Sequence, residues 1–180
     1  MLIRTFTQNV RAVQYWLAVL LLSSSLTCRA EGFFFEVASP KFRVSIPGLP
    51  QMKMELHPMN ASQPHLRFLG AEGPYTVAVF TPAAATGMTP LECAGATVKA
   101  LAARPGVPPA SEVYKSRLND KTFIAIYAVQ IAMGVHLHAH LLSAAGGRHC
   151  IEVHASRISI LEDELGTWVG ALEKASIEPD

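Results

Sequence analysis

Hydrophobic and polar residues alternate along much of this chain, which is the pattern of β-strands with one buried face. Phe42, Val44 and Ile46 alternate with polar residues, and a Pro-Gly pair ends the segment. Similar segments recur as far as residue 155, separated by residues that form turns. We therefore expect mainly antiparallel strands at residues 33–37, 42–46, 52–56, 66–69, 75–80, 111–118, 122–129, 135–142 and 149–155.

Two other segments have the three-to-four-residue hydrophobic spacing of amphipathic helices, and each begins with a capping box. The first box is formed by Thr89 and Glu92, with a proline at the first helical position and a Pro-Gly pair after the last turn. The second box is Ser159 to Glu162. We expect a middle helix after Thr89 and a long C-terminal helix over residues 159–175.

These elements together resemble the small bacterial envelope proteins of the PsbP-like fold, a group that includes the DcrB-like proteins. The resemblance spans most of residues 33–179 and also includes the middle helix. Its other segments are Phe42 to Gly48, the hairpin Val135 to Ala155, the closing helix Ser159 to Ala175, and Ser176 to Pro179. It implies an α+β fold, in which an antiparallel β-sheet with covering helices forms an α/β/α sandwich with a long C-terminal helix. It also implies a non-catalytic binding or assembly role, and it transfers no catalytic motif to this chain.

The first thirty residues have the pattern of a cleavable secretory signal peptide. Arg4 and Arg11 form a positively charged start, residues 13–22 form a short apolar run, and small or polar residues follow up to Ala30. Cleavage after Ala30 leaves residues 31–180 as a single domain, which is long enough for one hydrophobic core. We therefore expect a periplasmic or secreted protein.

Two other interpretations of the leader differ in what stays attached to the membrane. Acylation at Cys28 would give a lipoprotein, but Ser25 and Thr27 stand where that signal needs an aliphatic and a very small residue. An uncleaved anchor would need about 20 apolar residues, and this run is shorter and ends in serines. We favour cleavage, and we expect no transmembrane anchor in the mature chain.

Removal of the leader also changes the charge balance. The whole chain has 15 basic and 14 acidic side chains. Arg4, Arg11 and Arg29 leave with the leader, so the mature chain has a net charge of about −2. Nucleic-acid partners require clustered Lys and Arg side chains, and the sequence has no basic stripe. We therefore expect no nucleic-acid partner, and the expected partner is another envelope or secreted protein.

Which of the three cysteines can form a disulfide bond also depends on whether the leader is removed. If Cys28 is removed, Cys93 and Cys150 remain as a pair in an oxidising compartment, which favours a disulfide bond between them. The chain-entropy model gives such a bridge a stabilisation of roughly 4 kcal/mol. The alternative is that the two residues are separately buried thiols.

The hairpin at residues 135–155 has the most distinctive side chains. Three histidines on its first strand, and a cysteine, a glutamate and a histidine on its second, alternate with apolar residues, so each set shares one face. We expect a three-residue loop at Ala144 to Gly146. Matching the apolar faces across that loop gives the opposed pairs His136–His154, His138–Glu152 and His140–Cys150.

Imidazole and carboxylate groups are ligands of zinc and copper, so this face is a candidate metal site. The candidate ligands are His136, His138, Glu152 and His154. The alternative interpretation is that these side chains form only the polar face of a half-buried hairpin.

A second and weaker metal candidate lies earlier in the chain, where thioethers and an imidazole fall within eight residues. Its residues are Met52, Met54, His57 and Met59. Cuprous ions favour such ligands. Strand alternation also explains Met52 and Met54 as core residues that need no metal.

Catalytic motifs are scarce in this sequence. It has neither a Gly-x-Ser-x-Gly nucleophile elbow nor a phosphate loop. We expect a non-catalytic periplasmic or envelope protein that binds a protein or small ligand through a sheet edge or loops. An immunity or inhibitor protein against a secreted toxin is one form of this hypothesis. The first alternative is a periplasmic zinc- or copper-binding protein that uses the hairpin, and the second is a small hydrolase that uses the same patch through Glu152.

Overall fold

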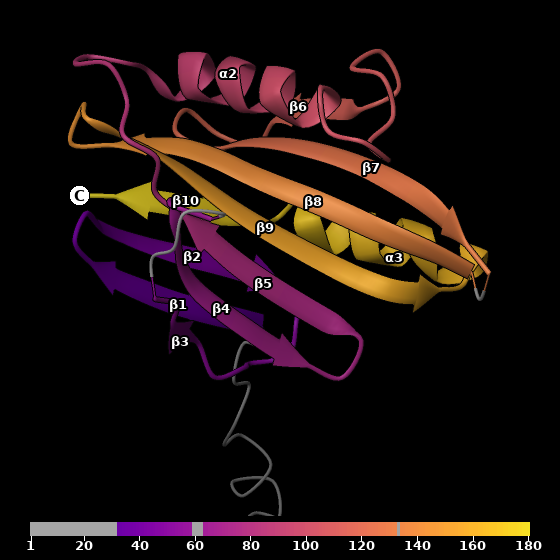
Figure 1. Cartoon of the computed structure of the whole chain (residues 1–180). Coiled ribbons are helices and arrows are strands. Elements are labelled where there is room, and N and C mark those ends of the chain that lie inside the picture. The colour runs from indigo at the N-terminus through magenta and orange to yellow at the C-terminus, as the bar shows by residue number, and fades with distance from the viewer. Residues whose placement is uncertain (1–31, 59–62, 133) are drawn as a thin grey trace, which may run out of the picture. The chain divides into compact units, whose positions relative to one another are not determined.

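The computed structural model describes residues 32–58, 63–132 and 134–180, and for residues 159, 160, 162 and 163 only the backbone (Figure 1). The expected signal peptide, including Cys28, lies outside these residues, and so does Met59. The described residues belong to one compact unit. Among the described helices, none is both long enough and apolar enough to cross a membrane.

A seven-stranded antiparallel sheet forms the centre of this unit. Its longest strands are β8 and β9, with twelve residues each, and they pair with each other in the middle of the sheet. From one edge to the other the strands are β3 (Glu55–Leu56), β4 (Leu66–Glu72), β5 (Tyr75–Phe80), β9 (His149–Ile160), β8 (Gly134–Ala145), β7 (Phe123–Ile131) and β6 (Tyr114–Arg117).

A smaller sheet joins the two ends of the described chain. Its strands, in spatial order, are β1 (Gly32–Ala38), β2 (Lys41–Pro47) and β10 (Ser176–Pro179). The C-terminal strand β10 pairs antiparallel with β2, and an ion pair between Lys41 and Asp180 lies at the end of that pairing. The last residues of the chain are therefore part of the β-structure and follow a helix, α3 (Glu162–Leu172).

The main hydrophobic core lies between the two sheets and helix α3. Phe42, Val44 and Ile46 of β2 are fully buried, as their alternation predicts, and they belong to one cluster with the inward-facing residues of β8 and with Trp168 and Leu172 of α3. Figure 1 shows the small sheet and α3 on one side of the large sheet, and helix α2 (Pro90–Ala102) on the other. The large sheet is therefore covered on both faces.

The expected fold class, an α/β/α sandwich with a long C-terminal helix, is wrong. The described part of the chain is mostly antiparallel β-sheet with two short helices, of 13 residues in α2 and 11 in α3. The expected helix start at Ser159 fails because β9 continues to Ile160, which pairs with Val135 of β8. Leu161 takes the N-cap position of α3 without a side-chain hydrogen bond. Strand pairing thus overrides the second capping box.

The first capping box forms as expected and fixes the start of α2. The Glu92 N–H donates to Thr89 Oγ1 at 3.3 Å, and the Thr89 N–H donates to Glu92 Oε2 at 2.8 Å. Pro90 occupies the first turn, where its missing N–H costs no hydrogen bond. This local signal succeeds because no strand pairing competes with it.

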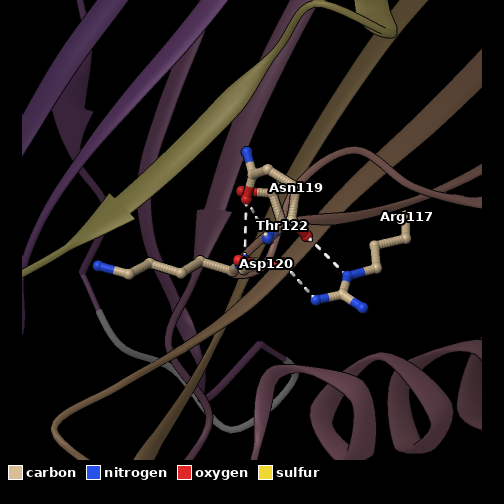
Figure 2. A network of polar contacts seen from close by, with 5 residues as sticks. Arg117, Asn119, Asp120 and Thr122 are labelled. Carbon is tan, nitrogen blue, oxygen red and sulfur yellow. Dashed lines mark hydrogen bonds and ion pairs between the residues drawn. The ribbon is translucent and has the colours of Figure 1, made fainter.

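The turn between β6 and β7 is held by side chains (Figure 2). Asn119 Oδ1 accepts hydrogen bonds from the N–H groups of Lys121 and Thr122, at 2.9 and 2.8 Å. Arg117 donates to the Asn119 carbonyl oxygen and pairs with Asp120. The turn therefore positions Thr122, which is fully buried and connects the two sheets. Its Oγ1 donates to the Ile177 carbonyl oxygen at 3.1 Å and accepts from the Ile177 N–H at 3.0 Å.

We predict that Thr122→Val destabilises the protein by about 1–3 kcal/mol, because it removes both hydrogen bonds and leaves the polar backbone groups of Ile177 buried without a side-chain partner. Urea denaturation measures this change in the free energy of unfolding. The matched control is Thr97→Val on helix α2, which should change stability by less than about 0.5 kcal/mol. Equal effects of the two substitutions would contradict a role for Thr122 in joining the sheets.

Candidate functional site beneath helix α2

The candidate site lies on the face of the large sheet that helix α2 covers. Alternate residues of β7, β8 and β9 point to this face, while their neighbours point to the main core. A second, smaller hydrophobic cluster forms here between helix and sheet. Its buried members are Ala94, Val113, Ala125, Tyr127 and Leu142.

A disulfide bond ties α2 to the sheet at this face. Cys93 of α2 pairs with Cys150 of β9, with 5.5 Å between their Cα atoms and a sequence separation of 57. The expected cysteine pair is thus present. Cys150 shares its strand face with Glu152 and His154, so the bridge fixes the helix over the distinctive hairpin residues.

The expected register of the hairpin is wrong by four residues. His140, not His136, lies opposite His154, and Ala144 lies opposite Cys150. The turn follows Ala145, because Gly146 and Gly147 both have positive φ, at 58° and 62°, and together reverse the chain two residues later than expected. An even shift keeps every residue on its expected face, so the histidines still gather on one side.

Four histidines form what we call the histidine stack: His136, His138, His140 and His154. The rings of His140 and His154 are nearly parallel, with centroids 4.3 Å apart and planes 4° apart. His154 also contacts His138, whose Nδ1 lies 3.0 Å from His154 Nε2. His136 lies against His138 with ring centroids 4.0 Å apart. The stack therefore runs across two strands, from β8 to β9.

Two further side chains complete this arrangement. Glu152 is buried, and its Oε1 lies 2.9 Å from Nδ1 of the buried His140. Tyr127 of β7 stacks on His138, with 4.8 Å between ring centroids and 15° between planes. The pairing of His140 with Glu152 was absent from the expected ligand set. The alternation along the hairpin places His140 and Glu152 on the same face of the sheet, so the sequence could have indicated a contact between them. Which residues lie opposite each other depends on the strand register.

Burial disfavours the charged form of three histidines in the stack, His136, His138 and His154. Desolvation lowers the pKa of His136. Desolvation, followed by the charges of neighbouring histidines, lowers the pKa of His138 to about 4 and that of His154 to about 2. A neutral imidazole offers one donor and one acceptor, so neighbouring rings can hydrogen-bond to each other without repulsion.

The stack is a poor arrangement for a metal ion. The parallel rings direct their lone pairs along different lines instead of toward one point, and the hydrogen bond between His138 and His154 already uses a nitrogen of each. Glu152 contacts His140, which the expected ligand set omitted. Among the described residues, no group of three or more His, Cys, Asp or Glu side chains is placed to hold a metal.

The described residues of the second metal candidate are buried or half-buried. Met52 is buried in the main core, and Met54 packs against that core. Both lie against Gly70, where an added Cβ would be 2.5 Å from Met54 Sδ. His57 is held through its backbone N–H, which donates to the Arg67 carbonyl oxygen at 2.8 Å. The two described methionines thus serve as packing residues.

An open groove of about 460 Å³ lies beside the stack, between α2 and the strands β6 and β7. This volume falls within the usual range for ligand pockets. Two cationic side chains, Lys115 and Arg117, stand on the β6 side. The remaining lining is mainly apolar or small and consists of Leu91, Ala94, Gly95, Val98, Ser116, Phe123, Ile124 and Leu142. Comparison with models of known protein families and with curated proteins finds no match.

We predict that the protein loses stability in acid because of the histidine stack. In the unfolded chain His138 and His154 take up protons as the pH falls through about 6.5, whereas the folded protein holds their pKa values near 4 and 2. Over that interval the unfolded state binds more protons, so stability is complete above pH 6.5 and falls as the pH falls. Each histidine contributes up to about 1.4 kcal/mol per pH unit.

Urea denaturation at several pH values between 7.5 and 4.5 measures this loss. His154→Gln should make the fall in unfolding free energy with pH less steep, because it removes one of the protons taken up on unfolding. His65→Gln changes an exposed histidine and should leave the steepness unchanged. The idea fails if the two variants lose stability in acid as steeply as each other.

We predict that reduction of the Cys93–Cys150 bond lowers the free energy of unfolding by roughly 4 kcal/mol, because a loop of this length gains much entropy when it opens in the unfolded chain. Urea denaturation with and without dithiothreitol gives the difference. The double variant Cys93→Ala/Cys150→Ala should show a similar loss and no response to the reductant. If dithiothreitol also destabilises the double variant, the loss of stability has a cause other than reduction of this disulfide bond.

Proposed function

We propose that this chain is an exported, non-catalytic binding protein that holds an extended, acidic segment of a partner protein in the groove between α2 and β6. The observation that carries the proposal is the combination of an open apolar groove with an edge strand along its side. Proteins commonly use such edges to add a strand from a partner, whose main chain supplies affinity and whose alternate side chains supply specificity.

The main chain of β6 supports this mode of binding. Within the described part of the chain, β7 is the only strand paired with β6. The Leu118 N–H donates to the Thr122 carbonyl oxygen at 2.9 Å, so Leu118 is oriented toward β7. Because the ladder alternates, Ser116 and Tyr114 share that orientation, while the backbone groups of Lys115 and Arg117 point outward. These outward groups can pair with a partner strand.

The side chains of β6 favour an acidic partner. Lys115 and Arg117 lie opposite Ala125 and Phe123 of β7, which face α2, so both cations stand on the groove side of the strand. Both are exposed. Arg117 is also close to Phe123, with its guanidinium carbon 6.0 Å from the ring centroid. Asp or Glu side chains directly opposite Lys115 or Arg117 would form favourable cross-strand pairs.

Export and the absence of catalysis belong to the same proposal. The leader pattern and the disulfide-bonded cysteine pair are both typical of proteins that function in an oxidising compartment. The polar groups of the histidine stack mostly engage each other, an arrangement more suited to supporting a covered face than to turnover. An immunity or inhibitor protein against a secreted toxin would use a groove of this kind.

We predict that Gly95→Leu abolishes partner binding without damage to the fold. A Cβ added at Gly95 meets no heavy atom within 4 Å, so a leucine can fill the groove without a clash. Leucine is also the better helix former by nearly 1 kcal/mol, so stability should rise. Gly166→Leu on α3 is the matched control, because its Cβ also meets open space. Peptides selected from a random displayed library provide the ligand, and calorimetry measures binding.

Selected peptides should carry Asp or Glu at alternate positions, and they should bind the Gly166→Leu variant as they bind the unmodified protein. Retained affinity in Gly95→Leu would place the binding site elsewhere. Failure to select any peptide that depends on the groove would also count against the proposal.

We predict that Lys115→Gln and Lys115→Pro weaken peptide binding to different extents, because the side-chain charge and the backbone N–H of Lys115 contribute separately. Glutamine removes the charge and the hydrogen bond from Lys115 Nζ to the Ala110 carbonyl oxygen, but it keeps the outward N–H, so it should weaken peptide binding modestly and reduce its dependence on salt. Proline also removes the outward N–H and should weaken binding by a further tenfold or so. Lys53→Gln changes an exposed lysine outside the groove and serves as the control. Equal affinities of the two Lys115 variants would rule out strand addition along β6.

A further inference from the structure

A second cavity lies on the opposite face of the large sheet, between helix α3 and the paired residues Tyr75 of β5 and Arg157 of β9. Its volume is about 270 Å³. The turn after β2 closes one side of it, because Gly48 approaches α3 so closely that an added Cβ would be 2.8 Å from that of Ala171. The remaining lining comes from Glu164, Thr167 and Trp168 of α3.

Arg157 is an unusual residue for its position. Along β9 it follows Ile151, Val153 and Ala155 on the strand face that points into the main core, and all three of those residues are buried. The Arg157 side chain is only 18% exposed. Its guanidinium carbon lies 5.4 Å from the centroid of the Tyr75 ring. A charged group this deep requires polar partners, since burial of a charge without them is costly.

Those partners are incomplete. Nη2 of Arg157 pairs with Oε2 of Glu164, but the buried Nε has no hydrogen-bond partner. Trp168 is 4% exposed, and its buried Nε1 also lacks a partner. Two buried N–H donors therefore remain unsatisfied in residues that line the same cavity. Buried donors are almost always paired, so this combination points to an acceptor that comes from outside the chain.

We propose that this cavity binds a small carboxylate, whose oxygens accept hydrogen bonds from Arg157 Nε and Trp168 Nε1. A carboxylate offers two acceptor oxygens and a negative charge for the guanidinium. The rings of Tyr75 and Trp168 suit a compact apolar or aromatic body. The site is separate from the groove beneath α2, so either can exist without the other.

Benzoate is a suitable probe, with benzamide as its neutral counterpart of the same shape. Trp16 belongs to the expected signal peptide, so the mature protein labelled with ¹⁵N in the indole ring gives one signal, from Trp168, which Trp168→Phe should remove. Benzoate should bind one molecule per chain and shift the Trp168 indole signal downfield as it becomes hydrogen-bonded. Benzamide should bind at least about tenfold more weakly. Absence of saturable binding up to about 10 mM benzoate would overturn the proposal.

Three variants test the individual contacts by calorimetry. Trp168→Phe retains an aromatic ring without the N–H, and Arg157→Gln removes the charge, so each should weaken benzoate binding by about tenfold or more. Glu164→Gln removes the carboxylate that competes for Arg157 and should tighten binding, a change that a merely structural role would not produce. Arg148→Gln, in an exposed turn, should bind benzoate unchanged. Unaltered affinity in both Trp168→Phe and Glu164→Gln would refute the assignment.

Discussion

The pairing of β8 with β9 is the interaction on which the rest of the structure depends. Each strand has twelve residues, and together they occupy the middle of the large sheet. Because side chains alternate, Leu137, Ala139 and Leu141 enter the core between the sheets, while His138 and His140 face α2. A single hairpin thus supplies both a conventional core and a polar face, and a slip of one residue would exchange them.

Helix α2 can cover the polar face because most of the polar side chains on this face form hydrogen bonds with one another. Neutral imidazoles hydrogen-bond and stack, Glu152 is matched by His140, and the disulfide bond fixes α2 above them. The low pKa values of His138 and His154 follow from the same burial. The side chains that suggest a metal site in the sequence form an internal polar layer beneath a helix. The open volume lies beside this layer.

Features that depend on local sequence pattern could be predicted from the sequence. Predictions were wrong where the pairing of segments distant in the sequence determines the structure. The faces of β2 and of the hairpin follow from a period of two, and the capping box at Thr89 forms because its helix has no rival pairing. The hairpin register was wrong because Gly146 and Gly147 move the turn. The long C-terminal helix was wrong because β9 continues past Ser159. The partners of Arg157 depended on how α3 packs, which no spacing reveals.

Polar side chains occupy buried positions on both faces of the large sheet, where apolar residues are expected. The two faces differ in whether the buried donors and acceptors have hydrogen-bond partners. On the α2 side, histidines replace apolar residues and contact one another and Glu152. Among the buried ring nitrogens of the described histidine stack, only His140 Nε2 is unpaired, and His140 lines neither cavity described above. On the α3 side, Arg157 interrupts an apolar row, and both it and Trp168 keep an unpaired donor beside an open volume. The residue types alone drew attention to the histidines. Arg157 is the better candidate for ligand binding, because a ligand can accept a hydrogen bond from a donor that has no partner beside a cavity.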